Sequence, residues 1–274
     1  DAWTGYPFQL KLACADPAIY LSRGRTKLIP KTLTAVVMAP NLKTVIVHFE
    51  GPTRVENAQL TAPVEVNHDP ATIRVHVVSR NSIRAETTLS SVQIRQSDAR
   101  LAGIDTIHLN TLFNRSDQHD IDLMADVTNL IVHTKEGQKV ILAAIATIIK
   151  AGNVPREPAA NGVEWMKAAA GLETQFTIEN FNARYGATEL HAEGTVKIEG
   201  TGTLEGMVKT RVTKLNAFLG ELQKREVLTP KKARTASTLL GLFDKGEGVA
   251  ADLRLKGGEF FWGPLKLGRQ TPLF

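Results

Sequence analysis

The feature that most constrains the fold of this chain is an alternation of apolar and polar residues with a period of two. This alternation is the pattern of a β-strand that buries one face and exposes the other to water. It recurs along the chain near residues 45–49, 73–78, 81–96, 120–127, 204–212 and 252–256. Most of the chain is therefore expected to be β-strand.

Turn signals containing Pro or Gly lie between these segments, for example at Asp16-Pro17, Glu50-Gly51-Pro52 and Asp69-Pro70. Short, regular spacing between such turns favours an antiparallel meander over alternating strand–helix units. The sequence therefore predicts a mainly β fold, in which a long curved antiparallel sheet, or several, forms an open half-barrel or groove.

One of the expected strands changes phase along its length. In the segment 81–96, the apolar residues lie at odd positions up to Leu89 and at even positions from Val92 onward. An extra residue in a long curved strand would produce this change. We therefore expect a β-bulge close to position 90.

Helix is expected in one place only, near the C-terminus. Two apolar stripes with helical spacing follow one another there, and Thr229-Pro230 between them is typical of a helix N-cap followed by Pro at the first position. The stripes consist of Leu215, Phe218, Leu219 and Leu222, then Ala233, Ala236, Leu240 and Phe243. A short amphipathic helix pair is predicted, which either caps the open end of the β core or presents its basic edge to a partner or a membrane.

The chain is expected to form a single elongated β-rich domain over residues 1–274. The segment Gly152–Val163 contains two prolines and two glycines and is the best candidate for a linker or long loop. If the domain is subdivided, we expect an N-terminal half at 1–151, the linker at 152–163 and a C-terminal half at 164–274.

Composition excludes several classes of protein. The longest run that is apolar apart from one Thr, Val140–Ile149, is about half the length of a membrane-spanning helix. Cys14 is the only cysteine, which excludes a disulfide scaffold. We expect Cys14 to be a small core residue on the same strand face as Leu10 and Leu12. A net charge of +5 and an aromatic content of 6% do not favour a nucleic-acid partner.

Catalytic and metal-binding motifs are absent from the sequence. It contains no nucleophile elbow, zinc-binding pair or phosphate-binding loop. Asp120, Asp122 and Asp126 would share a strand face, an arrangement more typical of a solvated surface than of a cation site. The seven histidines are scattered, so we expect no catalytic residues, no metal and no cofactor.

The C-terminal third contains motifs that resemble a known family. A strand at 253–256 leads into Gly257-Gly258, an aromatic strand and Gly263-Pro264-Leu265-Lys266-Leu267-Gly268, which is similar to the close of AsmA-like envelope proteins. With Gly5-Tyr6-Pro7-Phe8 near the start, the chain as a whole resembles the proteobacterial family called domain of unknown function 2125.

This resemblance implies a periplasmic protein, secreted or anchored to the inner membrane by a hydrophobic N-terminal segment that is absent from this chain. AsmA-like relatives are associated with the movement of lipids along an apolar β groove, and the family implies no catalytic residues. We expect the lining of such a groove to include Val45, Val47, Phe49, Ile73, Val75, Val77, Val196, Ile198, Leu204 and Val208. The alternative is that these residues form an ordinary closed core.

The expected function is therefore non-enzymatic binding or trafficking of lipids or other hydrophobic molecules in the cell envelope. The membrane surface and an envelope protein are further candidate partners. One alternative is a structural or assembly factor that binds a protein partner by strand addition or through its groove. A second alternative, weaker because no catalytic set can be assembled, is an envelope hydrolase that uses His119 and the neighbouring acids.

Overall fold

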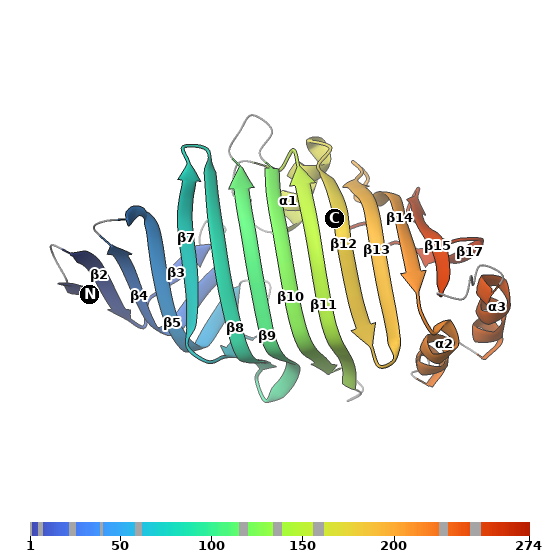
Figure 1. Ribbon diagram of the computed structural model, residues 1–274, viewed down its shortest axis with the longest axis horizontal. Helices are drawn as coiled ribbons and strands as arrows, with labels where there is room; N and C mark the ends of the chain where they lie inside the picture. Colours follow the sequence, from blue (N-terminus) through green and yellow to red (C-terminus); the bar gives the residue numbers. More distant parts are fainter. Residues whose placement is uncertain are drawn as a thin grey trace.

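The structure is a computed structural model that describes residues 2–4, 8–21, 26–38, 41–57, 62–114, 120–133, 139–155, 162–224, 230–241 and 248–274. Its described strands all belong to one antiparallel sheet (Figure 1). The strands of the first half are β1 (Ala2–Thr4), β2 (Gln9–Ala15), β3 (Ile19–Leu21), β4 (Thr26–Met38), β5 (Asn41–Asn57), β6 (Val64–Asn67), β7 (Ala71–Ser79), β8 (Ser82–Gln96), β9 (Ala99–Asn114), β10 (Asp120–His133) and β11 (Lys139–Gly152). The mainly β fold predicted from the alternation is confirmed.

The second half of the chain continues the same sheet and adds the described helices. Its strands are β12 (Gln175–Tyr185), β13 (Thr188–Ile198), β14 (Leu204–Val212), β15 (Val249–Lys256), β16 (Glu259–Trp262) and β17 (Leu265–Arg269). The helices are α1 (Gly162–Gly171), α2 (Leu215–Lys224) and α3 (Pro230–Gly241). Because β11 pairs directly with β12, the two halves of the chain share one sheet.

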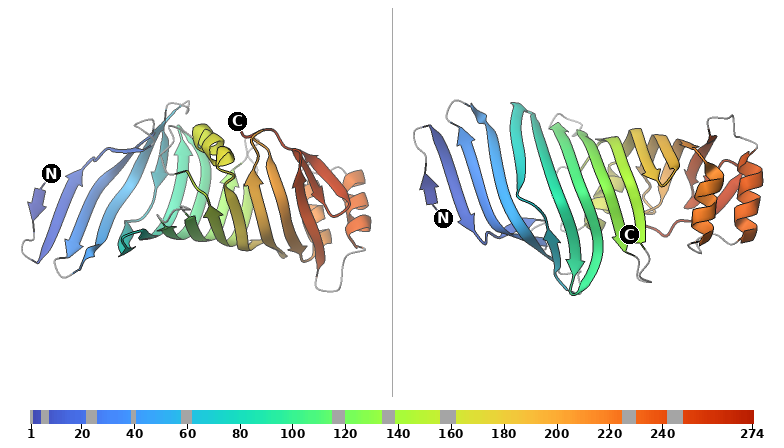
Figure 2. Two further views of the ribbon diagram at one scale, coloured as in Figure 1. Left: turned by 90° about the horizontal axis from the view of Figure 1, so that it is seen from above. Right: turned by 60° about the horizontal axis from the view of Figure 1, so that its bottom comes forward.

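The topology is a meander in which most strands pair with the strand before and the strand after them. From β8 to β17 every strand pairs with its successor in the chain. β6 and β7 follow one another between β5 and β8 and pair with both, so these four strands form a small closed ring of pairings. The result is a long, curved ribbon of strands (Figure 2).

The change of phase near position 90 is real, but it does not arise from a bulge. The register of β8 and β9 is the same on both sides of Ser91, which has a left-handed backbone with φ 55°. Asp69, between β6 and β7, lies beside Ser91, and Asn129 of β10 lies beside Asp105 of β9 at the same level of the sheet. Asn129 is also left-handed, with φ 49°. We call this level of the sheet, marked by Asp69, Ser91, Asp105 and Asn129, the bend line. The pairing of β8 with β9 and of β9 with β10 keeps the same register on both sides of it.

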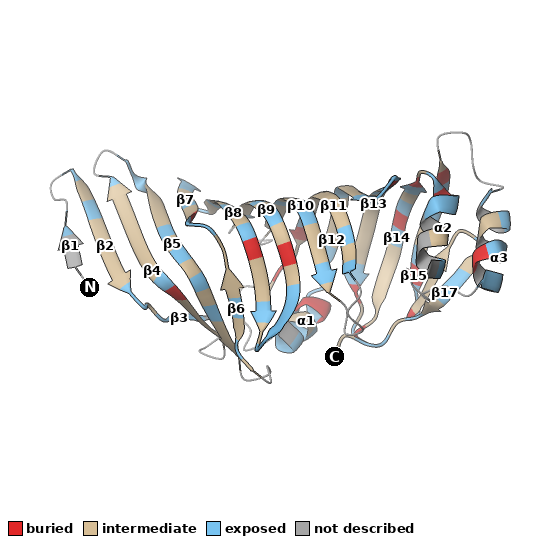
Figure 3. Ribbon diagram, turned by 90° about the horizontal axis from the view of Figure 1, so that it is seen from below, coloured by how far each residue is buried: buried red, intermediate tan, exposed pale blue. Residues whose placement is uncertain are grey.

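Side-chain hydrogen bonds join the strands at the bend line. The Ser91 hydroxyl donates to Asp69 Oδ2 at 2.7 Å, and Asn129 Nδ2 donates to Asp105 Oδ2 at 2.6 Å. Ala71 and Val92, next to the line, are each 3% exposed without any helix above them in the described structure. The bend therefore buries residues by bringing two parts of one sheet together (Figure 3).

The helix pair predicted near the C-terminus is confirmed as α2 and α3. Leu215 and Leu219 of α2 pack with Val212 and Val249 of the sheet. Pro230 is the first residue of α3, as expected, whereas the proposed cap Thr229 lies outside the described residues.

The expectation of helix in one place only was wrong, because α1 was missed. Trp165, Met166, Ala169 and Ala170 of α1 form an apolar stripe that packs on Ile198. The stripe is short and two of its members are alanines, so its periodicity is weak until a partner surface is known.

The expectation of a turn at Glu50-Gly51-Pro52 was also wrong, since these residues lie inside β5. The strand opposite them is interrupted between β6 and β7, at His68, Asp69 and Pro70. Pro52 has no N–H to donate, and at this interruption the ladder does not require one.

Candidate functional site

The most distinctive feature of the sheet is that one of its faces carries no charge. Residues that pair across neighbouring strands point to the same side of the sheet, so the strand register shows which side chains share a face. One such row crosses fourteen strands, from β2 to β17. It consists of Leu10, Val37, Val45, Val75, Ala85, Thr111, Leu123, Ile149, Ile178, Gly194, Val208, Leu253, Trp262 and Leu265.

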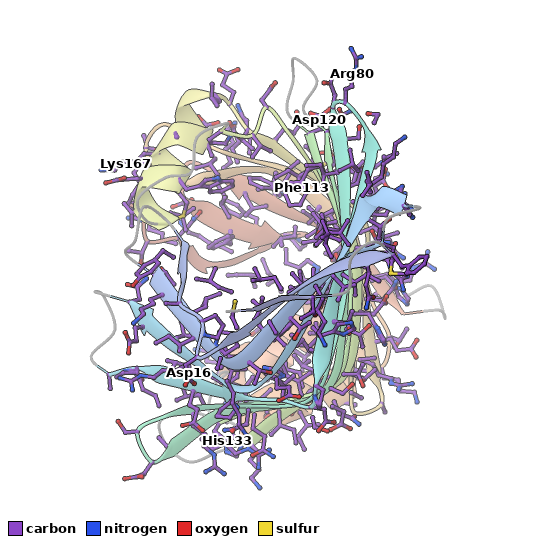
Figure 4. The ribbon with its side chains drawn as sticks, turned by 90° about the vertical axis from the view of Figure 1, so that its left-hand side faces the viewer. Asp16, Arg80, Phe113, Asp120, His133 and Lys167 are labelled. Carbon is purple, nitrogen blue, oxygen red and sulfur yellow. The ribbon has the colours of Figure 1, made fainter. Side chains whose placement is uncertain are left out.

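We call the side of the sheet to which this row points the apolar face. A parallel row supports the same assignment, since Val77, Ile83, Phe113, Ile121, Ala151, Phe176 and Val196 are also successive partners. Seen from the N-terminal side of the molecule, the sheet curls around this face, and Phe113 lies on the inside (Figure 4). Asp16, Arg80 and Lys167 lie at the periphery.

The described helices cover only the C-terminal part of the apolar face. Ala169 and Ala170 of α1 pack on Ile198, with Phe176, Leu204 and the C-terminal Phe274 around them. α2 packs beside Val212 and Val249. No residue of β2 to β11 belongs to the buried clusters that α1 and α2 form, although α1 lies near β9 to β11 in the ribbon (Figure 3), and Val77 and Phe113 remain 40% and 39% exposed.

The total accessible surface agrees with a sheet that is open on this side. The protein exposes 16700 Å², whereas a compact monomer of 29.9 kDa exposes about 11,700 Å². Few described residues are fully buried, and they concentrate at the bend line and under the helices. Most residues of the apolar face are therefore only half-buried.

The structure places all ten predicted lining residues on the apolar face, but in two different environments. Those of the first half lie on the uncovered strands β5 and β7: Val45, Val47, Phe49, Ile73, Val75 and Val77. In the second half, Ile198 and Leu204 are covered by α1, and Val208 is 5% exposed. Val196 faces Phe176 and Gly206 on the neighbouring strands.

Sequence reasoning missed the central part of this face, on β9 to β12. Its residues are Ile107, Leu109, Phe113, Leu123, Ile145, Ile149, Phe176 and Phe181. The alternation at 107–113 is visible in the sequence and could have identified the β9 residues. In β11 both faces are largely apolar, so its sequence does not show which residues share the face of Leu123.

The opposite side of the sheet, the polar face, holds the charged and histidine side chains. Lys197 lies 2.8 Å from Glu199 and 3.2 Å from Glu205, and hydrogen bonds to these carboxylates raise the pKa of Lys197 above its usual value. Lys150 pairs with Glu179 at 2.6 Å, and the hydrogen bond to that carboxylate likewise raises the pKa of Lys150. These are surface ion pairs in a solvated grid.

The polar face also has a shallow hollow of about 990 Å³ over β12 to β15, lined by His191, Lys209 and Asp252 among others. His48 Nδ1 and His76 Nδ1 each lie 2.9 Å from a threonine hydroxyl on a neighbouring strand, and His191 Nδ1 pairs with Asn182 Oδ1. These contacts link neighbouring strands and assemble no catalytic set.

The acidic row considered as a cation site also lies on β10. Asp122 is opposite Lys150, and Asp126 is opposite His108. In the described part of the chain, no group of three or more His, Cys, Asp or Glu side chains is arranged to hold a metal ion. His119, the residue of the hydrolase alternative, lies outside the described residues.

Fold and site together define a protein with an open antiparallel sheet, one face of which is apolar from one end to the other. The chain belongs to the family described as "Uncharacterized protein conserved in bacteria (DUF2125)", whose family model matches residues 2–270. No curated protein and no solved structure shows significant similarity to it. None of the helices in the described ranges has the length and hydropathy of a membrane-spanning segment.

Proposed function

We propose that the protein is a non-enzymatic, periplasmic protein that binds or carries lipids or other hydrophobic molecules on its apolar face. The observation that supports this proposal is the row from Leu10 to Leu265, which crosses fourteen strands without a charged side chain. Large exposed apolar surfaces mark interaction sites, because contact with water costs about 25 cal/mol per Å². The periplasmic location rests on the resemblance to AsmA-like envelope proteins.

The dimensions of the uncovered part suit an acyl chain. The row of the apolar face crosses eight strands here, β2, β4, β5 and β7 to β11, and their seven spacings of about 4.8 Å give a width of about 34 Å. This width exceeds the hydrocarbon thickness of one bilayer leaflet, about 15 Å, so an extended acyl chain fits across it. Each buried CH₂ group of a bound chain would contribute about 0.8 kcal/mol before ordering costs.

The experiment that tests the proposal is native mass spectrometry of the purified protein, combined with organic extraction of what copurifies. The expected result is a discrete adduct of lipid mass that extraction removes. A clean mass that stays unchanged after incubation with phospholipid would contradict the proposal.

A matched pair of variants locates the binding surface. Phe113→Lys places a charge on the apolar face, and Met124→Lys places the same charge on the polar face, where Met124 is 47% exposed. Both side chains are partly exposed, so both variants are expected to fold. Lipid occupancy should fall at least about fivefold in Phe113→Lys and stay unchanged in Met124→Lys.

The second candidate function, binding of a protein partner by strand addition, is favoured by the two ends of the ribbon. β1 and β17 each pair with a single neighbour among the described strands, so each leaves one backbone edge for a further strand. A protein that is free of lipid and remains so, but binds an extended peptide, would favour this function.

A further inference from the structure

The ends of the N-terminal strands carry a group of unusually exposed apolar side chains. Phe8 precedes β2 and is 78% exposed, and Leu42 at the start of β5 is 71% exposed. Met38, at the end of β4, and Val78, near the end of β7, are also exposed. Because β2 and β5 begin where β4 and β7 end, these four residues lie along one edge of the sheet. We call this edge the basic rim, because basic side chains also lie along it.

Along the strands from β2 to β8 the charge at this rim has a single sign, and an acidic side chain, Asp120 at the start of β10, follows further along the edge (Figure 4). Residues 2–12, 36–45 and 76–85 contain Lys11, Lys43, Arg80 and Arg84 and no aspartate or glutamate. Arg80 lies at this edge of the sheet, on the side opposite Asp16 and His133 (Figure 4). Exposed apolar side chains between basic ones are the composition that binds the interface of an anionic bilayer.

The other ends of the same strands differ in charge. Residues 13–21, 26–33, 50–57 and 64–72 contain five acidic side chains and three basic ones: Asp16, Glu50, Glu56, Glu65 and Asp69, against Lys27, Lys31 and Arg54. Arg23 and Arg25 follow β3 in the sequence and lie outside the described residues. Tyr20, which is 64% exposed, lies at that edge. An exposed aromatic residue therefore occurs at both edges, but only the basic rim combines it, along β2 to β8, with uniformly positive charge.

We infer that the basic rim docks the protein on an anionic lipid bilayer, with Phe8 and Leu42 inserted at the interface and Lys43 and Arg80 against the lipid phosphates. This inference extends the proposed function, because the uncovered apolar face reaches the rim at Leu10 and Val77, both of them exposed. A lipid leaving the bilayer at the rim would meet apolar side chains without crossing a charged row.

The test is flotation of the protein with vesicles of phosphatidylcholine alone or of phosphatidylcholine with phosphatidylglycerol. The wild-type protein should float with the anionic vesicles and release from them as salt is raised. Phe8→Ser combined with Leu42→Ser should weaken this binding by about tenfold or more, since the inserted apolar area is lost. Lys43→Glu combined with Arg80→Glu should abolish the preference for anionic vesicles.

Tyr20→Ser is the matched control, because it removes an exposed aromatic side chain from the opposite edge, and it should bind vesicles as the wild-type protein does. Failure of the wild-type protein to bind anionic vesicles, or equal loss in Tyr20→Ser, would overturn the inference. Lipid adducts in native mass spectra should persist in the rim variants. A rim variant that loses vesicle binding but retains its lipid adduct would show that membrane docking and lipid binding are separate properties. The inference and the proposed function can therefore fail independently.

Discussion

At the residue scale, two glycines of the β13–β14 pair show how closely the strands approach at the C-terminal end of the apolar face. A Cβ atom at Gly194 would lie 2.3 Å from the Met207 carbonyl oxygen, and one at Gly206 would lie 2.2 Å from the Thr195 carbonyl oxygen. Both obstacles are backbone atoms, so no side chain can move aside to make room. The close approach thus requires glycine at both positions.

We predict that Gly194→Ala lowers the free energy of unfolding by about 2 kcal/mol or more, because the two strands must separate. Gly200→Ala, in the turn between these strands, should change it by less than about 0.5 kcal/mol, since no atom lies within 4 Å of its added Cβ. Urea unfolding followed by circular dichroism measures both. Equal destabilisation by the two substitutions would contradict this account.

A second prediction at this scale concerns Glu259, on β16. Hydrogen bonds from Lys266 at 2.5 Å and from Arg269 at 3.1 Å hold the pKa of its carboxyl below the usual value. A lowered folded-state pKa means that the stabilisation is present above the unfolded-state pKa and is lost as the pH falls through the folded-state pKa. Glu259→Gln should therefore lower Tm at neutral pH.

The Tm difference between wild type and Glu259→Gln should disappear in acid, once the wild-type carboxyl is protonated as well. Melting curves from pH 7 down to pH 2 measure the effect. A difference that stays constant across this range would mean that the ion pair is not its cause.

At the element scale, α1 closes the C-terminal part of the apolar face. Ala169, on the side of the helix that packs against the sheet, is 0% exposed. Thr174 just after the helix is also fully buried, with its hydroxyl donating to the Asn153 carbonyl at 2.7 Å. Alanine at position 169 lets the helix approach the sheet closely. The helix is thus fixed by packing rather than by its own propensity.

We predict that Ala169→Leu destabilises the protein by about 1–3 kcal/mol, because the larger side chain must push α1 away from Ile198. Ala168→Leu is the matched control, since Ala168 is exposed on the same helix and should tolerate the change. Chemical denaturation of both variants decides the matter. If Ala168→Leu is the more harmful of the two, the packing described for α1 is wrong.

At the scale of the whole molecule, the ribbon of strands is extended rather than compact. A compact chain of 274 residues has a radius of gyration of about 19 Å. Fourteen spacings separate the fifteen strand positions from β1 to β17, which at about 4.8 Å each gives a path of about 67 Å across the sheet. Small-angle X-ray scattering of the monomer should therefore give a radius of gyration several ångströms above the compact value. A value of about 19 Å would mean that the sheet closes on itself in solution.

The sequence by itself determined the local features of this protein. Alternation in segments such as 73–78 and 204–212 is visible without any partner, because the period of two is a property of each strand alone. It was enough to predict a mainly β fold, the α2–α3 pair and ten residues that share one face. The shift from Leu89 to Val92 likewise located the irregular position, although not its nature.

Only the tertiary structure decided how these local features combine. The pairing of Leu123 with Thr111 and Ile149, and the coincidence of Asp69, Ser91 and Asn129 at one level, depend on register between strands. The cover of α1 over Ile198, and the packing of α2 beside Val212 and Val249, depend on which segments meet in space. These contacts join residues far apart in the chain, and the period of a single strand contains no information about them.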